Sequence, residues 1–474
     1  MNNSKKINLF MPQRRIIGIS LIYFYFFNYN FTFAQEMTSD FFDYKYNSII
    51  YDSNLNDWNN KTSFGPLRYQ DSNFKFETEE LGDSFKLYRT YGLNLNLYNY
   101  NLYAFQHISY KSKFYSFLYF RIVNEDDNHP RYTGIARNKS RAGFNSGETD
   151  FAGFGYQDEI FLLQFGRGRQ SWGVGNDIKI VLNENSPSYD YGLFGLKFGN
   201  YRFRYFHGFL ENIDLNNRYI NGRGVEWNNY NNLLLSISEI VIYSGLDRPM
   251  DFSYMNPVSS HLEVEFNNRQ NKLGVDSGNA VWQLAIDYKL KSNIRIMSNF
   301  IIDELVLDKI QLDSNKTNGL AFSSKIIWCP LFIPENSNIF MSYIYVGTKT
   351  FRHEIGYNNF VQRGAPLGWA HGSDGYEFNL GSDIIFNEKI LMQMKLGKRS
   401  NGENSILDLS YSPNEDYLRG PFPSGQKDNI HFLFYRIDWK INKNLFIFTS
   451  IDYSSSSKTN NNSKINVGIN LSKN

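Results

Sequence analysis

Residues 193–205 read Leu-Phe-Gly-Leu-Lys-Phe-Gly-Asn-Tyr-Arg-Phe-Arg-Tyr and carry a clear structural signal. Gly199-Asn200 separates two short runs that are rich in aromatic and aliphatic residues. A two-residue turn containing glycine between two such runs is typical of a β-hairpin. The stretch therefore predicts two antiparallel strands joined by a tight turn.

The same pattern recurs along the chain. Three further hairpins are predicted, with Asn-rich or Lys-containing turns between residues 225–237, 287–302 and 437–451. Apolar residues also alternate with polar neighbours at Leu93, Leu95 and Leu97, and again at Ile465, Val467, Ile469 and Leu471. Period two is the period of a strand with two different faces, and no helical stripe follows residue 80. The sequence predicts an all-β, up-and-down antiparallel fold.

The composition suits a sheet with one apolar face and one wet face. The 474 residues include 41 Phe, 34 Tyr and 7 Trp, yet the mean hydropathy is negative. Outer-membrane barrels combine a lipid-facing apolar wall with a polar interior in this way. The formal net charge is only +2 and no charge block stands out, so we expect no nucleic-acid partner.

The N-terminus has the pattern of a secretory signal. Four basic residues precede an apolar stretch at residues 16–27, and small residues Thr32 and Ala34 precede Gln35. We predict a signal peptide over residues 1–34, the alternative being an uncleaved anchor. No later apolar run approaches the ~20 residues of a membrane helix. A membrane location then requires a closed barrel, because an open sheet leaves unpaired backbone groups in lipid.

The predicted fold is a transmembrane antiparallel β-barrel of the outer membrane. Strands of ~9–11 residues divide the mature chain into about 16–20 strands. Residues 90–474 are assigned to the barrel, and residues 35–89, which are less regular, to a periplasmic extension, a plug or a first irregular segment. The rival is a soluble secreted β-sandwich or propeller, but aromatic crowding at residues 115–120 favours membrane girdles in contact with outer-membrane lipid.

Few residues have the spacing that catalysis or metal binding needs. The lone Cys329 permits no intramolecular disulfide, and the seven histidines are scattered, so we expect no metal and no cofactor. Glu263 and Glu265 are assigned to one face of a strand on the inner wall. Ser84 and His431 stand in blocks that resemble those of GDSL-type esterases, but that family has an α/β fold. We therefore expect no enzyme activity, with an outer-membrane hydrolase as the remaining alternative.

The middle third of the chain resembles the Wzi family of outer-membrane capsule-assembly proteins. The first segment carrying the resemblance is Phe165-Gly166-Arg167 through Ser171-Trp172-Gly173-Val174-Gly175. The family's Leu-Ser-Asn-Asn-like stretch is replaced by Val181-Leu182-Asn183-Glu184-Asn185. The other matching segments are residues 218–227, 237–239 and 254–257, then Glu263, Glu265 and the pair Asp303-Glu304.

This resemblance implies a barrel of about eighteen strands with a small periplasmic helical part. It also implies binding of capsular or extracellular polysaccharide at the cell surface, without enzyme activity. A porin or export channel for a small or polymeric solute is the alternative function, and it requires an open lumen. We expect a monomer.

Sugars are bound by aromatic faces together with Asn, Asp, Glu and Arg hydrogen bonds. Residues of these kinds within the resembling segments and in the predicted outer loop 351–376 are the candidate polysaccharide ligands: Arg169, Trp172, Asn185, Arg223, Glu226, Glu239, Trp369 and Asp374. A second outer loop is predicted at residues 125–155. The structural alternative is that Trp172 is a girdle aromatic between turn-forming glycines and that the charged residues are compensating pairs in a plugged lumen.

Overall fold

A computed structural model describes residues 42–59, 61–64, 79–80, 84–124, 132–138, 141–184, 186–271, 278–306, 309–407, 420–458 and 461–473. The predicted signal peptide of residues 1–34 and the candidate ligand Asn185 lie outside this range.

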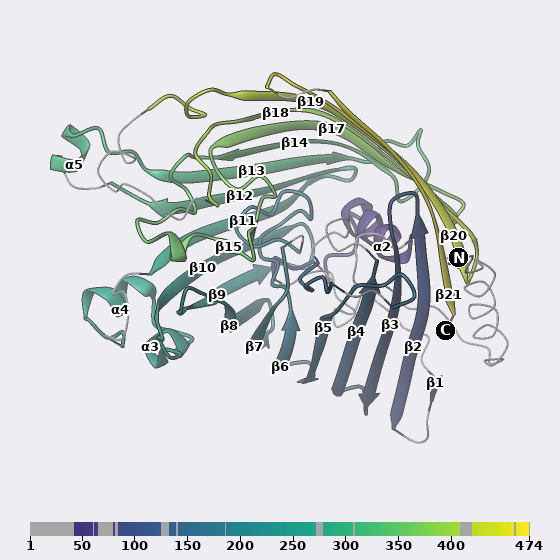
Figure 1. The fold of residues 1–474 in the computed structure, drawn as a ribbon, viewed down its shortest axis with the longest axis horizontal. Helices are drawn as coiled ribbons and strands as arrows, with labels where there is room; N and C mark the ends of the chain where they lie inside the picture. Colours follow the sequence, from purple (N-terminus) through teal and green to yellow (C-terminus); the bar gives the residue numbers. More distant parts are fainter. Residues whose placement is uncertain are drawn as a thin grey trace, which may run out of the picture.

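Eighteen long strands form one closed antiparallel barrel, which confirms the predicted fold class (Figure 1). Each strand pairs with its neighbours along the chain, and β2 pairs with β21 from Tyr91–Lys473 to Asn96–Gly468, which closes the ring. The strands are β2 Phe85–Asn96, β3 Tyr100–Tyr110, β4 Phe114–Val123, β5 Ser146–Gln157, β6 Phe161–Gly168, β7 Tyr189–Phe198, β8 Tyr201–Ile213, β9 Asn216–Asn228, β10 Leu233–Leu246, β11 Asn279–Lys291, β12 Ile294–Glu304, β13 Gly319–Trp328, β14 Asn338–Val346, β17 Gly375–Phe386, β18 Ile390–Asn401, β19 Asp428–Asn442, β20 Leu445–Ser456 and β21 Asn462–Lys473.

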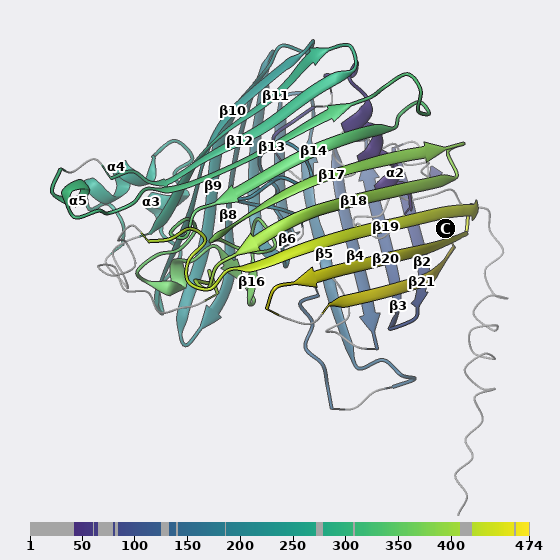
Figure 2. The same cartoon turned by 90° about the horizontal axis from the view of Figure 1, so that it is seen from above.

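The remaining elements are short. They are α2 Phe42–Ser53, α3 Phe252–Met255, α4 His261–Phe266, α5 Lys309–Asp313, the 3-10 turn η2 Gly356–Asn358, β1 Glu79–Glu80, and the small hairpin of β15 Val361–Gln362 and β16 Ala365–Pro366. Figure 2 shows α3, α4 and α5 beyond the strands, at the side of the molecule opposite the C-terminus. Among the described helices, none combines the length and the apolar character needed to cross a bilayer.

Alternation along the strands gives the barrel an apolar outside. In β13, Leu320, Ile326 and Trp328 point outward and are exposed, whereas Ser323 and Lys325 point inward and are buried. Exposed Ile, Leu, Phe and Val recur in the outward series of most other strands. Such a wall is stable only against lipid, so the structure is that of an outer-membrane barrel.

The two ends of the barrel differ in loop length. At one end the turns are short, for example 111–113, 199–200, 292–293 and 443–444. At the other end, here called the mouth, long connections span residues 124–145, 169–188, 247–278, 305–318, 347–374 and 402–427. Outer-membrane barrels keep short turns in the periplasm and long loops outside. The mouth therefore faces the exterior, and β2 begins at the periplasmic end.

The hairpin predicted around Gly199-Asn200 is confirmed, with Phe198 pairing with Tyr201. The assignment of Glu263 and Glu265 to a strand on the inner wall is wrong, because both lie in α4. Residues two apart on a helix do not share a face. Glu263 accordingly pairs with exposed Arg269, and Glu265 pairs with His261.

Candidate functional site

Three segments fill the lumen and are together called the plug: the described residues of 45–64 (45–59 and 61–64), those of 169–188 (169–184 and 186–188), and residues 347–374. Figure 1 shows α2 inside the ring of strands, where it contacts β13, β14 and β19. The largest buried apolar cluster contains residues of all three plug segments together with inward residues of the wall. The plug contributes Trp58 and Phe64, apolar residues between Trp172 and Leu182, and apolar residues between Phe351 and Trp369. The interior is thus a packed core over most of this volume.

Trp172 is at the centre of the plug. Its side chain is fully buried, with ring centroids 4.8 Å from Phe64 and 5.1 Å from Phe206. Its backbone forms bridges to Phe64 and Leu182. The alternative that Trp172 is a girdle aromatic is therefore wrong, because the tryptophan faces the inside of the barrel.

The glycines that flank Trp172 permit the inward turn. Gly173 and Gly175 have φ values of +110° and +73°. A Cβ at Gly173 would lie 2.7 Å from Asn299 Oδ1, the atom that accepts the Val174 N–H at 2.8 Å. Only glycine combines this conformation with such close approach to the wall. The predicted turn-forming role of these glycines is confirmed.

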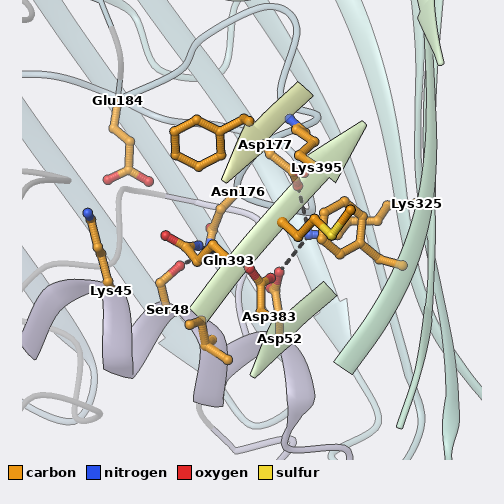
Figure 3. Close-up of a pocket in the computed structure, with 14 residues that line it drawn as sticks. Lys45, Ser48, Asp52, Asn176, Asp177, Glu184, Lys325, Asp383, Gln393 and Lys395 are labelled. Carbon is orange, nitrogen blue, oxygen red and sulfur yellow. Dashed lines mark hydrogen bonds and ion pairs between the residues drawn. The ribbon is translucent and has the colours of Figure 1, made fainter. Parts of the chain in front are cut away.

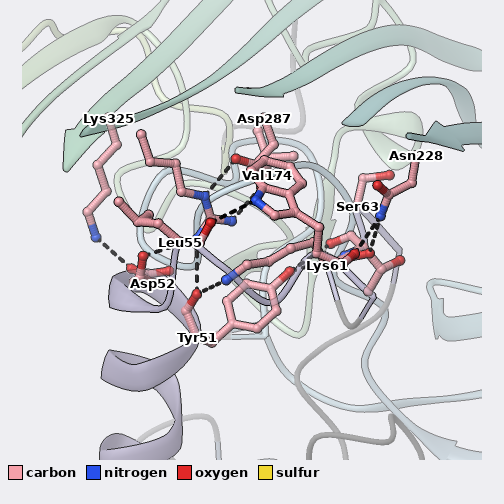
Figure 4. Close-up of polar contacts among 12 residues, drawn as sticks. Tyr51, Asp52, Leu55, Lys61, Ser63, Val174, Asn228, Asp287 and Lys325 are labelled. Carbon is pink, nitrogen blue, oxygen red and sulfur yellow. Dashed lines mark hydrogen bonds and ion pairs between the residues drawn. The ribbon is translucent and has the colours of Figure 1, made fainter. Parts of the chain in front are cut away.

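Buried ion pairs and hydrogen bonds lock the N-terminal part of the plug to the wall (Figure 4). Arg295 of β12 forms a bidentate pair with Asp287 of β11, and its Nη1 donates to the carbonyls of Tyr51 and Asp52 at 3.0 and 3.1 Å. Lys61 donates to the carbonyl of Tyr51. These carbonyls belong to the last turn of α2, where a helix lacks internal donors. The wall thereby supplies the C-terminal cap of the helix.

The predicted ligand Glu226 has a similar locking role. Its carboxylate accepts from the hydroxyls of Thr62 and Ser63 at 3.1 and 2.7 Å and pairs with Arg202. The next inward residue of β9, Asn228, donates to the carbonyl of Trp58 at 2.9 Å. Glu226 is buried, and its contacts attach the plug to β9.

A cavity of about 370 Å³ remains between α2, the inward loop 169–188 and the wall. Figure 3 shows carboxylate and ammonium groups converging on it. Lys325 of β13 donates to Asp52 at 3.0 Å and to Asp177 at 2.9 Å. The charged lining residues are Lys45, Asp52, Asp177, Glu184, Lys325, Asp383 and Lys395, and the apolar ones include Ile49, Phe340 and Phe434. Such a lining suits a polar occupant and offers no continuous apolar surface.

Burial opposes ionisation of Asp177, but the ammonium groups of Lys325 and Lys395 outweigh it and hold the pKa of this carboxyl below its usual 3.8. A lowered carboxyl pKa stabilises the fold above the unfolded-state pKa, and this stability disappears as the pH falls through the folded-state value.

We expect Asp177→Asn to lower the free energy of unfolding by about 1 kcal/mol at neutral pH. The difference from the unsubstituted protein should shrink as the pH falls below 3.8 and through the lowered folded-state pKa of Asp177. Urea unfolding in vesicles across this pH range measures both values. Asp247→Asn, in an exposed turn, is the control and should cost almost nothing at any pH. A difference that persists at low pH would show that charge is not the origin of the effect.

Two candidate ligands at the mouth also make internal contacts. Arg169 is buried in an ion pair with Asp150 and donates to the carbonyl of Ser186. Asp374 is buried and accepts from Thr348 Oγ1 at 2.6 Å and from the Ser424 N–H at 2.9 Å, which joins two mouth loops. The predicted outer loop 351–376 begins and ends at the mouth, but most of it folds into the barrel, where Phe351, Phe360 and Leu367 are buried.

Trp369 lies near a polar group that reaches the surface. Its ring is 5.2 Å from that of His371, in an edge-on arrangement. His371 hydrogen-bonds with Arg399, and Arg399 lies 3.6 Å from Glu377. The side chain of His371 is 34% exposed, so this cluster faces the solvent of the mouth.

Arg223 and Glu239 lie on the outer wall, away from the plug. Val225 and Ile237 are exposed on the outside, and the strand alternation places Arg223 and Glu239 in the same outward series of β9 and β10. They form an ion pair at 3.3 Å beneath the connection 247–278. The structure thus separates the candidate ligands into plug residues, mouth residues and an external pair, and their role as sugar ligands stays a prediction.

The charged cavity beside α2 was not predicted from the sequence. Its signal is a charge at an inward position of an otherwise apolar strand, as at Lys325 in Ser-Ser-Lys-Ile-Ile-Trp. The esterase-like pair is not assembled, since Ser84 precedes β2 at the periplasmic end and His431 faces outward near the mouth. Within the described part of the chain, no three His, Cys, Asp or Glu residues are grouped as a metal site would require.

No protein-family model matches the chain, and no curated protein matches its sequence. Among solved structures, the chain is similar to Wzi of Escherichia coli, described as an outer-membrane protein involved in group 1 capsule assembly and a carbohydrate-binding β-barrel. The TM-score is 0.60 at 13% identity, over 90% of this chain and 97% of Wzi. OprD of Pseudomonas aeruginosa gives a TM-score of 0.44 at 8% identity, over 82% of this chain and 94% of OprD. The resemblance found in the sequence is thereby confirmed for the fold: this chain is an outer-membrane β-barrel with the fold of Wzi.

Proposed function

We propose that this protein binds capsular or extracellular polysaccharide at the cell surface and helps to assemble or anchor it, without enzyme activity. The observation that carries the proposal is the plug. Buried ion pairs and the Trp172 core fill the lumen, which opposes a role as an open pore. The carbohydrate binding described for Wzi, which has the same fold, supports the same class of ligand here.

The mouth is the surface at which an external polymer arrives. In the cluster of Trp369, His371, Glu377 and Arg399, the imidazole of His371 reaches solvent and hydrogen-bonds with Arg399, while the ring of Trp369 and the carboxylate of Glu377 support them from the buried side. Sugars are held by such combinations of ring faces and polar groups. We assign the first sugar contacts to this cluster. Asp374 holds the two mouth loops beside it in place through its hydrogen bonds with Thr348 and Ser424.

The experiment combines binding with conductance. The probe is the extracellular polysaccharide extracted from the source cells, titrated against the purified protein in vesicles. We expect binding that weakens about tenfold when His371 and Arg399 are both replaced by alanine, since hydrogen bonds to charged groups contribute about 1.5–3 kcal/mol. Replacement of Glu354, which is exposed elsewhere on loop 347–374, is the matched control.

In planar bilayers, the same preparation should show no stable conductance steps. Large steps from the unsubstituted protein would favour the porin or export-channel function and contradict the proposal. Silence without polysaccharide binding would also contradict it.

A further inference from the structure

The connection between β10 and β11 folds back over the outside of the barrel. Its described part, residues 247–271, is here called the lid. Glu239, Val241 and Tyr243 continue the outward series of β10 that contains exposed Ile237, and the pairing of β10 with β9 has no register shift. All three are nevertheless fully buried or nearly so. Only a cover on the lipid side of the wall explains burial of both faces of this strand.

The inner side of the lid is fixed by a stack of rings. Tyr219 and Tyr243 of the wall stack at 5.1 Å, Tyr243 stacks on Tyr254 of α3 at 4.5 Å, and Tyr254 lies 5.9 Å from His261 of α4 at 19°. These arrangements are favourable for aromatic pairs. The stack joins both short helices of the lid to the outer wall.

Polar contacts complete this attachment. The backbone N–H of His261, at the start of α4, donates to the carboxylate of Glu239 at 3.1 Å. Arg223, the partner of Glu239, donates to the carbonyl of Asn256 at 3.2 Å. Tyr205 donates its hydroxyl to the carbonyl of Tyr254 at 3.1 Å. The Arg223–Glu239 pair is thus satisfied by the lid and shielded from the surroundings.

The outer side of the lid is apolar. Phe252 is 85% exposed, Val258 81% and Phe266 80%, and Leu262, Met250 and Met255 are also exposed. Leu262 and Phe266 are four residues apart, on the face of α4 opposite buried His261 and Val264. Soluble surfaces rarely gather so many large apolar groups. The lid therefore has a polar and aromatic inner side and a mainly aliphatic and phenyl outer side, next to which the exposed Glu263–Arg269 pair lies.

This apolar surface is continuous with the lipid-facing wall. Glu239 pairs across the sheet with Trp282, Trp282 with Ile302, and Ile302 with Leu320. Ile302 and Leu320 are exposed on the outside. The apolar belt of β12 and β13 thus continues along one row to the strand that the lid covers, and Figure 2 shows α3 and α4 beside the ends of these strands.

We propose that the lid is an interfacial membrane element whose outer face inserts into the outer leaflet, with acyl chains as its occupant. Short amphipathic helices bury their apolar faces about 5–10 Å into the boundary between headgroups and chains. The lid would shield the Arg223–Glu239 pair from lipid, where an unscreened charge is costly, and would hold the barrel at a fixed height. This inference is independent of polysaccharide binding.

The test places an environment-sensitive fluorophore on Phe266→Cys in a Cys329→Ser background, in phosphatidylcholine vesicles. Quenchers on the lipid are placed either near the headgroup or near the chain end. We expect a blue-shifted emission and about threefold stronger quenching by the shallow quencher than for the control Glu354→Cys, which is exposed on a mouth loop. Phe252→Cys should behave as Phe266→Cys does.

An emission like that of the control, with no quenching by lipid, would overturn the proposal. A blue shift that disappears on dilution of the protein, again without lipid quenching, would also overturn it and would indicate a second copy of the chain as the occupant. Because both labelled side chains are exposed, neither substitution removes an internal contact.

Discussion

Replacing Arg295 by methionine will lower the free energy of unfolding by about 3–5 kcal/mol, because it leaves the carboxylate of Asp287 buried without its guanidinium. Both side chains are almost completely buried in the lumen. The same substitution also removes the donors to the carbonyls of Tyr51 and Asp52. Urea unfolding in vesicles, followed by the mobility shift of the folded barrel in gels, measures the loss.

Two further variants separate the causes. The double substitution Arg295→Met with Asp287→Leu should recover most of the loss, since an apolar pair replaces an unpaired charge. It should still be less stable than the starting protein by about 1–3 kcal/mol, because the Asp52 carbonyl loses its Arg295 donor and the Tyr51 carbonyl keeps only Lys61. Arg269→Met breaks an exposed pair, which solvent screens, and should cost far less than the loss of the buried pair. Equal losses in the single and double variants would refute the explanation by buried charge.

Removing two of the three plug segments, which also frees the third from its partners, will convert a silent barrel into a channel. The variant lacks residues 42–64 and carries a short Gly-Ser linker in place of residues 172–184. Residues 347–374 then lose two backbone hydrogen bonds. The Leu367 carbonyl accepts one from the Asn183 N–H, and the Trp369 N–H donates the other to the Ile180 carbonyl. Barrels of 16–18 strands leave an aqueous pore when nothing fills them. We expect discrete, stable conductance steps in planar bilayers.

The matched control shortens the lid instead, by replacing residues 252–267 with the same linker. Because the lid lies outside the wall, its removal should leave the lumen closed and the bilayer silent. A folded, inserted variant without conductance would show that the wall residues and residues 347–374 together still close the lumen, and it would contradict the prediction. Conductance of the lid variant would contradict the placement of the lid on the outer wall.

Local sequence accounts for much of the wall. The alternation at Ile465, Val467 and Ile469 predicts an outward apolar face, and the structure exposes all three in β21. Two-residue turns such as Gly199-Asn200 fix the register of their hairpins, because turn type and strand pairing are local properties. The ring closes through the pairing of Lys473 in β21 with Tyr91 in β2.

The helix α4 shows where local pattern fails. Its sequence His-Leu-Glu-Val-Glu-Phe alternates like a strand, and six residues are too few to distinguish period two from period 3.6. Serine at position 260 caps the helix through the Glu263 N–H, and the ring stack of the lid holds it in place. Tertiary packing therefore selected the helix.

The sequence by itself determined the class of this protein: strands of membrane length, an apolar outer series, and the aromatic and glycine residues of the Trp172 segment. Only the tertiary structure decided where the candidate ligands lie and which groups they contact. Trp172 and Glu226 point into the plug, and Arg223 and Glu239 lie under a cover on the outer wall. The physical reason is that alternation specifies which side of the sheet a residue faces, whereas burial depends on segments far along the chain that fold back onto either side.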